Sequence, residues 1–209
     1  PAAGVDFDDS AWEDFRVGGK WGAYDSYVWF RAHVRIPEPL RPHKLGLRFL
    51  VGPRDGAKST AETLLYVNGT ALQAIDIWHE VAWLPPETYA GGGVSIALRA
   101  WSGIYGPPPT RHFKLAELVR IDEPTEKFYF LALTLHKAVQ VLDANDLRRE
   151  QILRALNAAF HRLDFTIPKS EAFYASVSAA YAGLRQAVDA WATVAEIKPA
   201  ITAVGHAHI

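Results

Sequence analysis

The chain of 209 residues is long enough for one large domain or two modest ones, and its 49% hydrophobic and 22% charged residues are typical of a globular protein. Its 22 basic and 23 acidic side chains give a formal net charge of −1, so it lacks the positive excess that attracts nucleic acid or an anionic membrane, and we expect neither as a partner. It contains no cysteine, which excludes disulfides and thiolate metal ligands, fits a reducing compartment and leads us to expect a cytoplasmic protein.

Residues 1–122 carry the short alternating patterns of β-strands. Segments 27–36, 45–51 and 94–101 each alternate apolar and polar residues, as half-buried strands do. The pair Asn68-Gly69 follows another apolar run and predicts a β-hairpin, because both residues tolerate a positive φ angle. Several short strands separated by Gly- and Pro-rich turns predict an antiparallel β-sandwich.

Beyond the strand region, apolar residues recur every three or four positions, which is typical of amphipathic helices. The first two helices show this spacing at Phe128, Leu131, Leu135, Val139 and Leu142, and then at Ile152, Leu153, Leu156, Phe160 and Leu163. Either Asn145 or Asp146 is expected to cap the second helix, and a third helix is expected to begin near residues 168–170. The short connections predict three antiparallel helices within residues 123–197.

Segment 198–209 returns to an apolar, β-prone pattern and ends on Gly205-His206-Ala207-His208-Ile209. Neutral imidazoles are common metal ligands. We interpret the segment as a buried strand that presents metal-ligating side chains at its carboxyl end. The alternative is that both histidines are ordinary polar residues at the edge of a domain.

This closing sequence resembles the opening catalytic motif of the glycoside hydrolase family 38 α-mannosidases. In cytosolic-type and bacterial members of that family, a galactose-binding-like jelly roll and a helical segment precede a catalytic α/β barrel. Segments 7–12, 29–31 and 66–69 are also similar to the accessory jelly rolls of many glycosidases. The resemblance implies an α+β chain with a jelly-roll β-sandwich at 1–122, a three-helix segment at 123–197 and the first strand of the barrel at 198–209.

The resemblance also implies a zinc-dependent enzyme that hydrolyses α-mannosidic bonds in oligosaccharides with retention of configuration. His208 matches a zinc ligand of the family motif, and His206 matches a residue with a supporting role. The nucleophile, the acid/base residue and the other zinc ligands are expected beyond Ile209. We therefore expect these 209 residues alone to be inactive. The resemblance leaves open whether the parent protein forms a homo-oligomer.

The tryptophans of the strand region are candidates for both packing and binding. Trp21 and Trp78 lie near expected loops, and we assign them as candidate sugar contacts because indole faces stack on sugar rings. Trp29 and Trp101 lie inside alternating strands and are expected in the core. The adjacent acids Asp8-Asp9 are interpreted as turn residues.

Two other functions remain open from the sequence. The chain could be a stand-alone carbohydrate-binding module, in which the sandwich holds a glycan and the helices act as a spacer. It could also be a structural domain that only contacts other proteins. Binding of a glycan by the isolated chain favours the module, whereas the closing histidine motif favours the enzyme.

Overall fold

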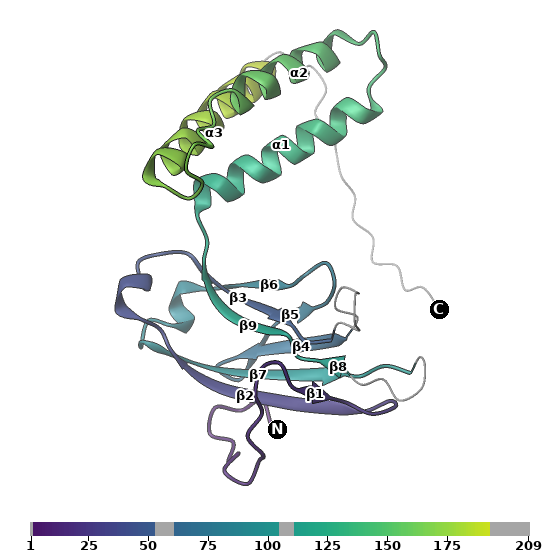
Figure 1. Cartoon of the computed structure of the whole chain (residues 1–209), viewed down its shortest axis with the longest axis vertical. Helices are drawn as coiled ribbons and strands as arrows, with labels where there is room; N and C mark the ends of the chain where they lie inside the picture. Colours follow the sequence, from purple (N-terminus) through teal and green to yellow (C-terminus); the bar gives the residue numbers. More distant parts are fainter. Residues whose placement is uncertain (1, 53–60, 105–110, 193–209) are drawn as a thin grey trace. The chain divides into compact units, whose positions relative to one another are not determined.

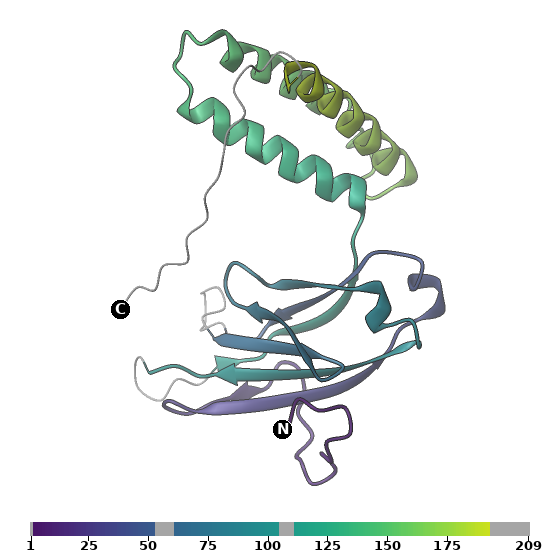
Figure 2. The ribbon, with the colours of Figure 1, turned by 180° about the vertical axis from the view of Figure 1, so that it is seen from behind.

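The computed structural model describes residues 2–52, 61–104 and 111–192. It divides between Ile121 and Asp122 into two compact units, one built of strands and one of helices (Figures 1 and 2). The predicted α+β class, with an antiparallel β-sandwich followed by three helices, is confirmed. The strand predicted at 198–209 lies outside the described residues.

The strand unit contains two main antiparallel sheets. The larger sheet has the order β2-β7-β4-β5, the smaller sheet has the order β6-β3-β9, and β1 pairs with β8. The strands are β1 (Lys20–Trp21), β2 (Tyr27–Arg35), β3 (Leu45–Leu50), β4 (Glu62–Val67), β5 (Thr70–Ile75), β6 (Val81–Leu84), β7 (Gly93–Trp101), β8 (Arg111–His112) and β9 (Leu115–Arg120). Strands β2 and β9 each form one edge of their sheet.

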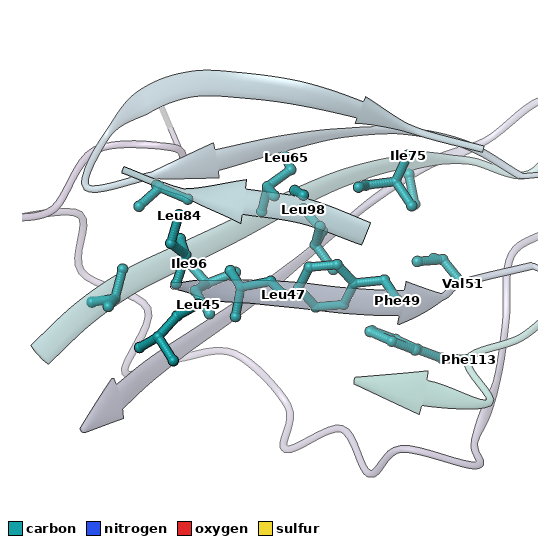
Figure 3. Packing of buried hydrophobic residues seen from close by; sticks show 14 of the residues in the cluster. Leu45, Leu47, Phe49, Val51, Leu65, Ile75, Leu84, Ile96, Leu98 and Phe113 are labelled. Carbon is teal, nitrogen blue, oxygen red and sulfur yellow. The ribbon is translucent and has the colours of Figure 1, made fainter. Parts of the chain in front are cut away.

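The core of the sandwich follows from the alternation of β3 and β7. Leu45, Leu47 and Phe49 of β3 are buried, as are Ile96 and Leu98 of β7. Figure 3 shows these side chains gathered with others from neighbouring strands. Because side chains alternate between the two faces of a strand, one face of each sheet supplies the core and the other carries polar or aromatic groups.

The hairpin between β4 and β5 has the predicted turn. Asn68 and Gly69 have φ angles of 50° and 82°, a region that Asn tolerates and Gly favours. The Asn68 side chain also joins two other segments, because its Oδ1 accepts from the Ser95 N–H at 2.9 Å and its Nδ2 donates to the Thr88 carbonyl at 2.7 Å. The predicted hairpin is confirmed.

The helical unit consists of α1 (Glu123–Val141), α2 (Leu147–Phe160) and α3 (Glu171–Ala192), which pack pairwise around a second apolar core. Asp122 caps α1 by accepting from the Thr125 N–H at 3.0 Å. Asp146, one of the two predicted caps, accepts from the Arg148 N–H at 2.8 Å at the start of α2. Within the described residues, no helix combines the length and apolar character that a membrane crossing requires.

Candidate functional site

The histidines predicted as a metal ligand and its support, His208 and His206, lie outside the described residues. Within residues 2–52, 61–104 and 111–192, no group of three or more His, Asp or Glu side chains is placed to hold a metal ion. The described part of the chain therefore offers no metal site of its own, and zinc binding through His208 stays a prediction.

Trp21 lies in the core and not at the surface position predicted for a sugar contact. Its side chain is buried, its Nε1–H donates to the Val51 carbonyl at 2.6 Å, and its ring meets the Phe30 ring edge-on at 5.5 Å. The sequence prediction of a surface position for Trp21 was wrong for a local reason. Trp21 belongs to the two-residue strand β1, which is too short to produce a recognisable alternating pattern.

Trp78 lies at the surface, as predicted, with 75% of its area exposed. The Asp76 carboxylate organises the loop around it by accepting from the N–H groups of Trp78 at 2.7 Å and His79 at 2.8 Å. Burial opposes ionisation of Asp76, but these bonds and one to the His79 side chain outweigh it and lower the pKa of the carboxyl. A sugar contact by Trp78 stays a prediction.

Trp29 and Trp101 were expected in the core, but both lie half-buried on the outer face of the larger sheet. Trp29 contacts the Tyr66 ring at 5.5 Å, and the Trp101 Nε1–H donates to Asp25 at 2.8 Å. In β2, it is Phe30 and its inward-facing neighbours that pack against the core. The run of consecutive apolar residues at the start of β2 hid which face points inward.

A cavity of about 500 Å³ lies at one edge of the sandwich. It is lined by β2 and β7 of the larger sheet, by β3 and β9 of the smaller sheet, and by residues 9–17. Ligand pockets in proteins commonly have volumes of about 300–1,000 Å³. The cavity is thus large enough for a small organic molecule, and its lining includes residues of β2 and β9, the edge strands of the two sheets.

The interior of the cavity is apolar, and its outer parts are polar or exposed. The buried side chains Leu47 and Phe49 of β3 and Ile96 and Leu98 of β7 line the inner wall. The outer lining includes Trp12, which is 37% exposed. Apolar walls with a few polar groups are typical of small-molecule sites.

Phe15 fixes residues 9–17 against the sandwich. Its ring lies 4.8 Å from the ring of Phe30 in β2 and 6.0 Å from the ring of Phe113. Phe30 and Phe113 also meet edge-on at 5.1 Å. This aromatic cluster stabilises the covering segment by packing, since aromatic pairs at these distances attract each other.

Arg31 of β2 is a buried arginine among the residues that line the cavity. Its side chain is only 2% exposed, and its Nε donates to Asp9 Oδ2 at 2.7 Å. Its Nη1 donates to the carbonyls of Ala2 and Gly4, the latter at 2.9 Å, and the guanidinium lies 5.3 Å from the Phe7 ring centroid. Its Nη2 is buried and has no hydrogen-bond partner among the described residues. A buried donor without a partner costs about 1–3 kcal/mol.

The charged groups of the lining are mostly acidic. Four carboxylates, those of Asp9, Glu13, Asp14 and Glu117, accompany the single guanidinium of Arg31. Asp9 was interpreted from the sequence as a turn residue, and its carbonyl does accept from the Trp12 N–H at 2.9 Å in a turn. Its side chain also holds Arg31 across 22 positions of the chain, which the sequence interpretation did not include. The signal that could have revealed this pair is an arginine in the middle of an otherwise apolar strand segment.

Comparison with known proteins finds only solved structures with a partly similar fold. No family model matches the chain, and no curated protein matches it. Among solved structures, a β-glucuronidase of Bacteroides uniformis is 15% identical with a TM-score of 0.44, over 56% of this chain and 15% of that one.

Two further β-glucuronidases match with lower TM-scores and over less of this chain. That of Lactobacillus rhamnosus is 14% identical over 43% of this chain and 17% of its own, with a TM-score of 0.32. That of Ruminococcus gnavus is 19% identical over 37% of this chain and 12% of its own, with a TM-score of 0.28. The chain thus spans less than a fifth of these structures, and similarity at this level does not assign an activity to it.

Proposed function

We propose that the chain is the amino-terminal accessory region of a zinc-dependent, retaining α-mannosidase that hydrolyses α-mannosidic bonds in oligosaccharides. The observation that carries the proposal is the sequence Gly205-His206-Ala207-His208-Ile209, placed after a β-sandwich and a three-helix unit. This order of elements and this closing motif are those of the glycoside hydrolase family 38 resemblance.

In this proposal His208 is one ligand of the zinc ion, and His206 supports it. A zinc ion so held supplies a Lewis-acidic contact that orients the hydroxyl groups of the sugar. Retaining glycosidases use two carboxyl groups, a nucleophile and an acid/base residue. The proposal assigns neither role to this chain, so the strand and helix units have an accessory role.

The runner-up is a stand-alone carbohydrate-binding module. The cavity at the edge of the sandwich favours it, because the cavity combines aromatic rings with carboxylates and a guanidinium. The exposed indole of Trp78, on its ordered loop, is a second surface that could contact a glycan. A module of this kind binds sugar without cleaving it, and this separates it from the enzyme.

The test uses the polypeptide that contains residues 1–209 together with whatever follows them in its gene. We expect it to hydrolyse 4-nitrophenyl α-mannopyranoside and to contain zinc by elemental analysis. The substitution His208→Ala is expected to abolish hydrolysis and to lower the zinc content. A matched control, His136→Ala, changes an exposed histidine of α1 and should leave both unchanged.

Two results would contradict the proposal. One is a polypeptide that binds no zinc and cleaves no α-mannoside. The other is hydrolysis of 4-nitrophenyl β-glucuronide in place of the α-mannoside, which would move the protein to another class of glycosidase.

A further inference from the structure

We infer that residues 10–17 form a lid on the edge cavity and that the Phe15 ring is the latch that holds this lid closed. Release of the latch opens the apolar interior of the sandwich to a small uncharged molecule. The inference rests on contacts within the sandwich and not on the proposed function. The lid supplies part of the cavity lining through Trp12, Glu13, Asp14, Phe15 and Val17.

The lid is anchored at both of its ends. Before it, the Asp9 carboxylate accepts from the buried Arg31 guanidinium at 2.7 Å. After it, the Gly18 N–H donates to the Phe113 carbonyl at 2.6 Å, and the Phe113 N–H donates to the Gly19 carbonyl at 3.1 Å. Motion of the lid is therefore confined to the residues between these two anchors.

Between the anchors, the lid is held by packing and not by hydrogen bonds. Every residue from 10 to 17 is exposed. Within the part of the chain that the structure describes, no hydrogen bond or ion pair joins residues 10–17 to a strand of the sandwich. Segments with few buried contacts and no hydrogen bonds to a sheet open at a smaller free energy than the whole domain unfolds. The lid can thus open while the sandwich stays folded.

Phe15 links the lid to the core of the sandwich. Its ring lies 4.8 Å from the ring of Phe30 and 6.0 Å from the ring of Phe113, and both of these rings pack in the core cluster. Aromatic pairs at such distances attract each other. Trp12 of the lid instead meets Phe7 edge-on at 5.4 Å, and Phe7 belongs to the amino-terminal segment. The Phe15 ring is therefore the contact whose loss frees the lid.

Gly19 provides the space in which the Phe15 ring sits. A β-carbon at position 19 would lie 2.9 Å from the Phe15 Cζ and 2.9 Å from the Arg16 carbonyl oxygen, which is closer than such atoms approach in proteins. Gly18 has a positive φ angle of 97°, but Gly19 does not have a positive one. Position 19 therefore requires glycine for space and not for its backbone conformation. A side chain there displaces the latch while Phe15 itself is unchanged.

The interior behind the latch favours an uncharged apolar molecule. Leu47, Phe49, Ile96 and Leu98 line it, are buried and offer no polar atom from their side chains. A charged or hydroxyl group placed against them would lose its hydrogen bonds to water without replacement, whereas an aryl or alkyl group gains by leaving water. The volume of about 500 Å³ is sufficient for a small molecule of this class.

Tryptic cleavage of the 209-residue chain after Arg16 measures opening of the lid, because a protease requires a locally opened segment. Phe15→Ala and Gly19→Ala are each expected to raise the cleavage rate about tenfold or more, because each removes the Phe15 ring from its two aromatic contacts. Rates are divided by those of the denatured chains, which corrects for the changed sequence around the cleaved bond.

Two controls separate the latch from a general loss of stability. Gly91→Ala adds a methyl group at an exposed glycine without a positive φ angle and with open space around it, so it should leave the cleavage rate unchanged. In the Phe15→Ala background, Gly19→Ala should add little, because the ring that it displaces is already absent. Thermal unfolding of each variant checks that it is folded.

Binding of N-phenyl-1-naphthylamine, an uncharged aryl probe that fluoresces in apolar surroundings, tests access to the cavity. Both latch variants should bind the probe about tenfold faster than the parent chain or Gly91→Ala, as followed by stopped-flow fluorescence. Ala32→Phe fills the cavity from its lining and should weaken binding about tenfold. Ala74→Phe changes an exposed alanine of β5 outside the lining and should leave binding unchanged.

The inference is overturned if the parent chain is cleaved after Arg16 as fast as both latch variants, or if Gly19→Ala adds its full factor in the Phe15→Ala background. It is also overturned if the probe binds no variant, or if Ala32→Phe and Ala74→Phe bind it equally. Where Phe15→Ala fails to fold, the comparison of Gly19→Ala with Gly91→Ala decides. Hydrolysis by the longer polypeptide is measured separately, so this inference and the proposed function can fail independently.

Discussion

Arg31 in strand β2 and Asp9 in the amino-terminal segment form an ion pair of 2.7 Å between the guanidinium Nε and the carboxylate Oδ2. The arginine side chain is 2% exposed and the aspartate side chain 34% exposed. The pair fixes the segment that covers the edge cavity, so it connects the stability of the sandwich with the shape of the candidate site. It also gives the first test.

Asp9→Asn should destabilise the sandwich by about 1–3 kcal/mol, because it leaves a buried guanidinium without its countercharge. A fully buried pair would cost about 3–5 kcal/mol, and the partial exposure of Asp9 reduces this. Urea unfolding followed by tryptophan fluorescence measures the change, since six of the seven tryptophans lie before residue 122. The neighbouring substitution Asp8→Asn should have a smaller effect, because Asp8 is exposed and its carboxylate accepts from the nearby Ser10 and holds no buried charge.

Asn68→Ala should destabilise the sandwich by about 2 kcal/mol. It removes two hydrogen bonds, to the Ser95 N–H and the Thr88 carbonyl, and places alanine at a φ angle of 50°. Asn68→Gly loses the same bonds but adopts this φ angle readily, so its cost should be smaller. Equal unfolding midpoints for the two variants would show that the positive φ angle at position 68 adds nothing to the loss of stability in Asn68→Ala.

Leu65→Ala and Leu184→Ala test whether the two units unfold separately. Leu65 is fully buried in the sandwich core, and Leu184 is 1% exposed in the helical core. Each truncation should cost its own unit about 2–5 kcal/mol. Leu65→Ala is expected to lower the midpoint of the unfolding transition that tryptophan fluorescence reports. Leu184→Ala is expected to lower the midpoint of the helical transition that far-ultraviolet circular dichroism reports. If each variant lowers both transitions equally, the units unfold as one.

The cap of α2 should make the helical unit sensitive to acid. Hydrogen bonds from the Arg148 side chain and N–H, together with its charge, lower the pKa of Asp146. A lowered pKa in the folded state means that this stabilisation is fully present above the unfolded pKa of about 3.9 and is lost as pH falls through the folded pKa.

The helical melting temperature of Asp146→Ala should therefore lie below that of the parent at pH 6, and the difference should shrink towards pH 2. Asn145→Ala is the matched control at the other position that the sequence offered as a cap, and it should have little effect at either pH. A difference for Asp146→Ala that is unchanged at pH 2 would mean that the ionised carboxylate is not what stabilises the helix.

The elements that the sequence predicted correctly are those whose signals are local. The alternation of β7 and the Asn68-Gly69 turn each depend on a few neighbouring residues, and both are present in the structure. Asp146 as a cap also follows from local chemistry, although the sequence did not distinguish it from Asn145.

The errors concern side chains whose environment is set by distant segments. Trp21 is buried because Val51, 30 positions away, accepts its indole N–H, and no local pattern encodes that contact. The inward face of β2 is decided by packing against β3 and Phe113 and not by β2 alone. The Arg31–Asp9 pair is equally non-local, and so the edge cavity could not be predicted from the sequence.

The most direct measurement of the central claim is hydrolysis of 4-nitrophenyl α-mannopyranoside by two polypeptides in parallel. One consists of the 209 residues, and the other continues through the residues that follow them in the gene. The proposal predicts no hydrolysis by the first and zinc-dependent hydrolysis by the second. Hydrolysis by the first, or none by a zinc-loaded second polypeptide, would contradict it.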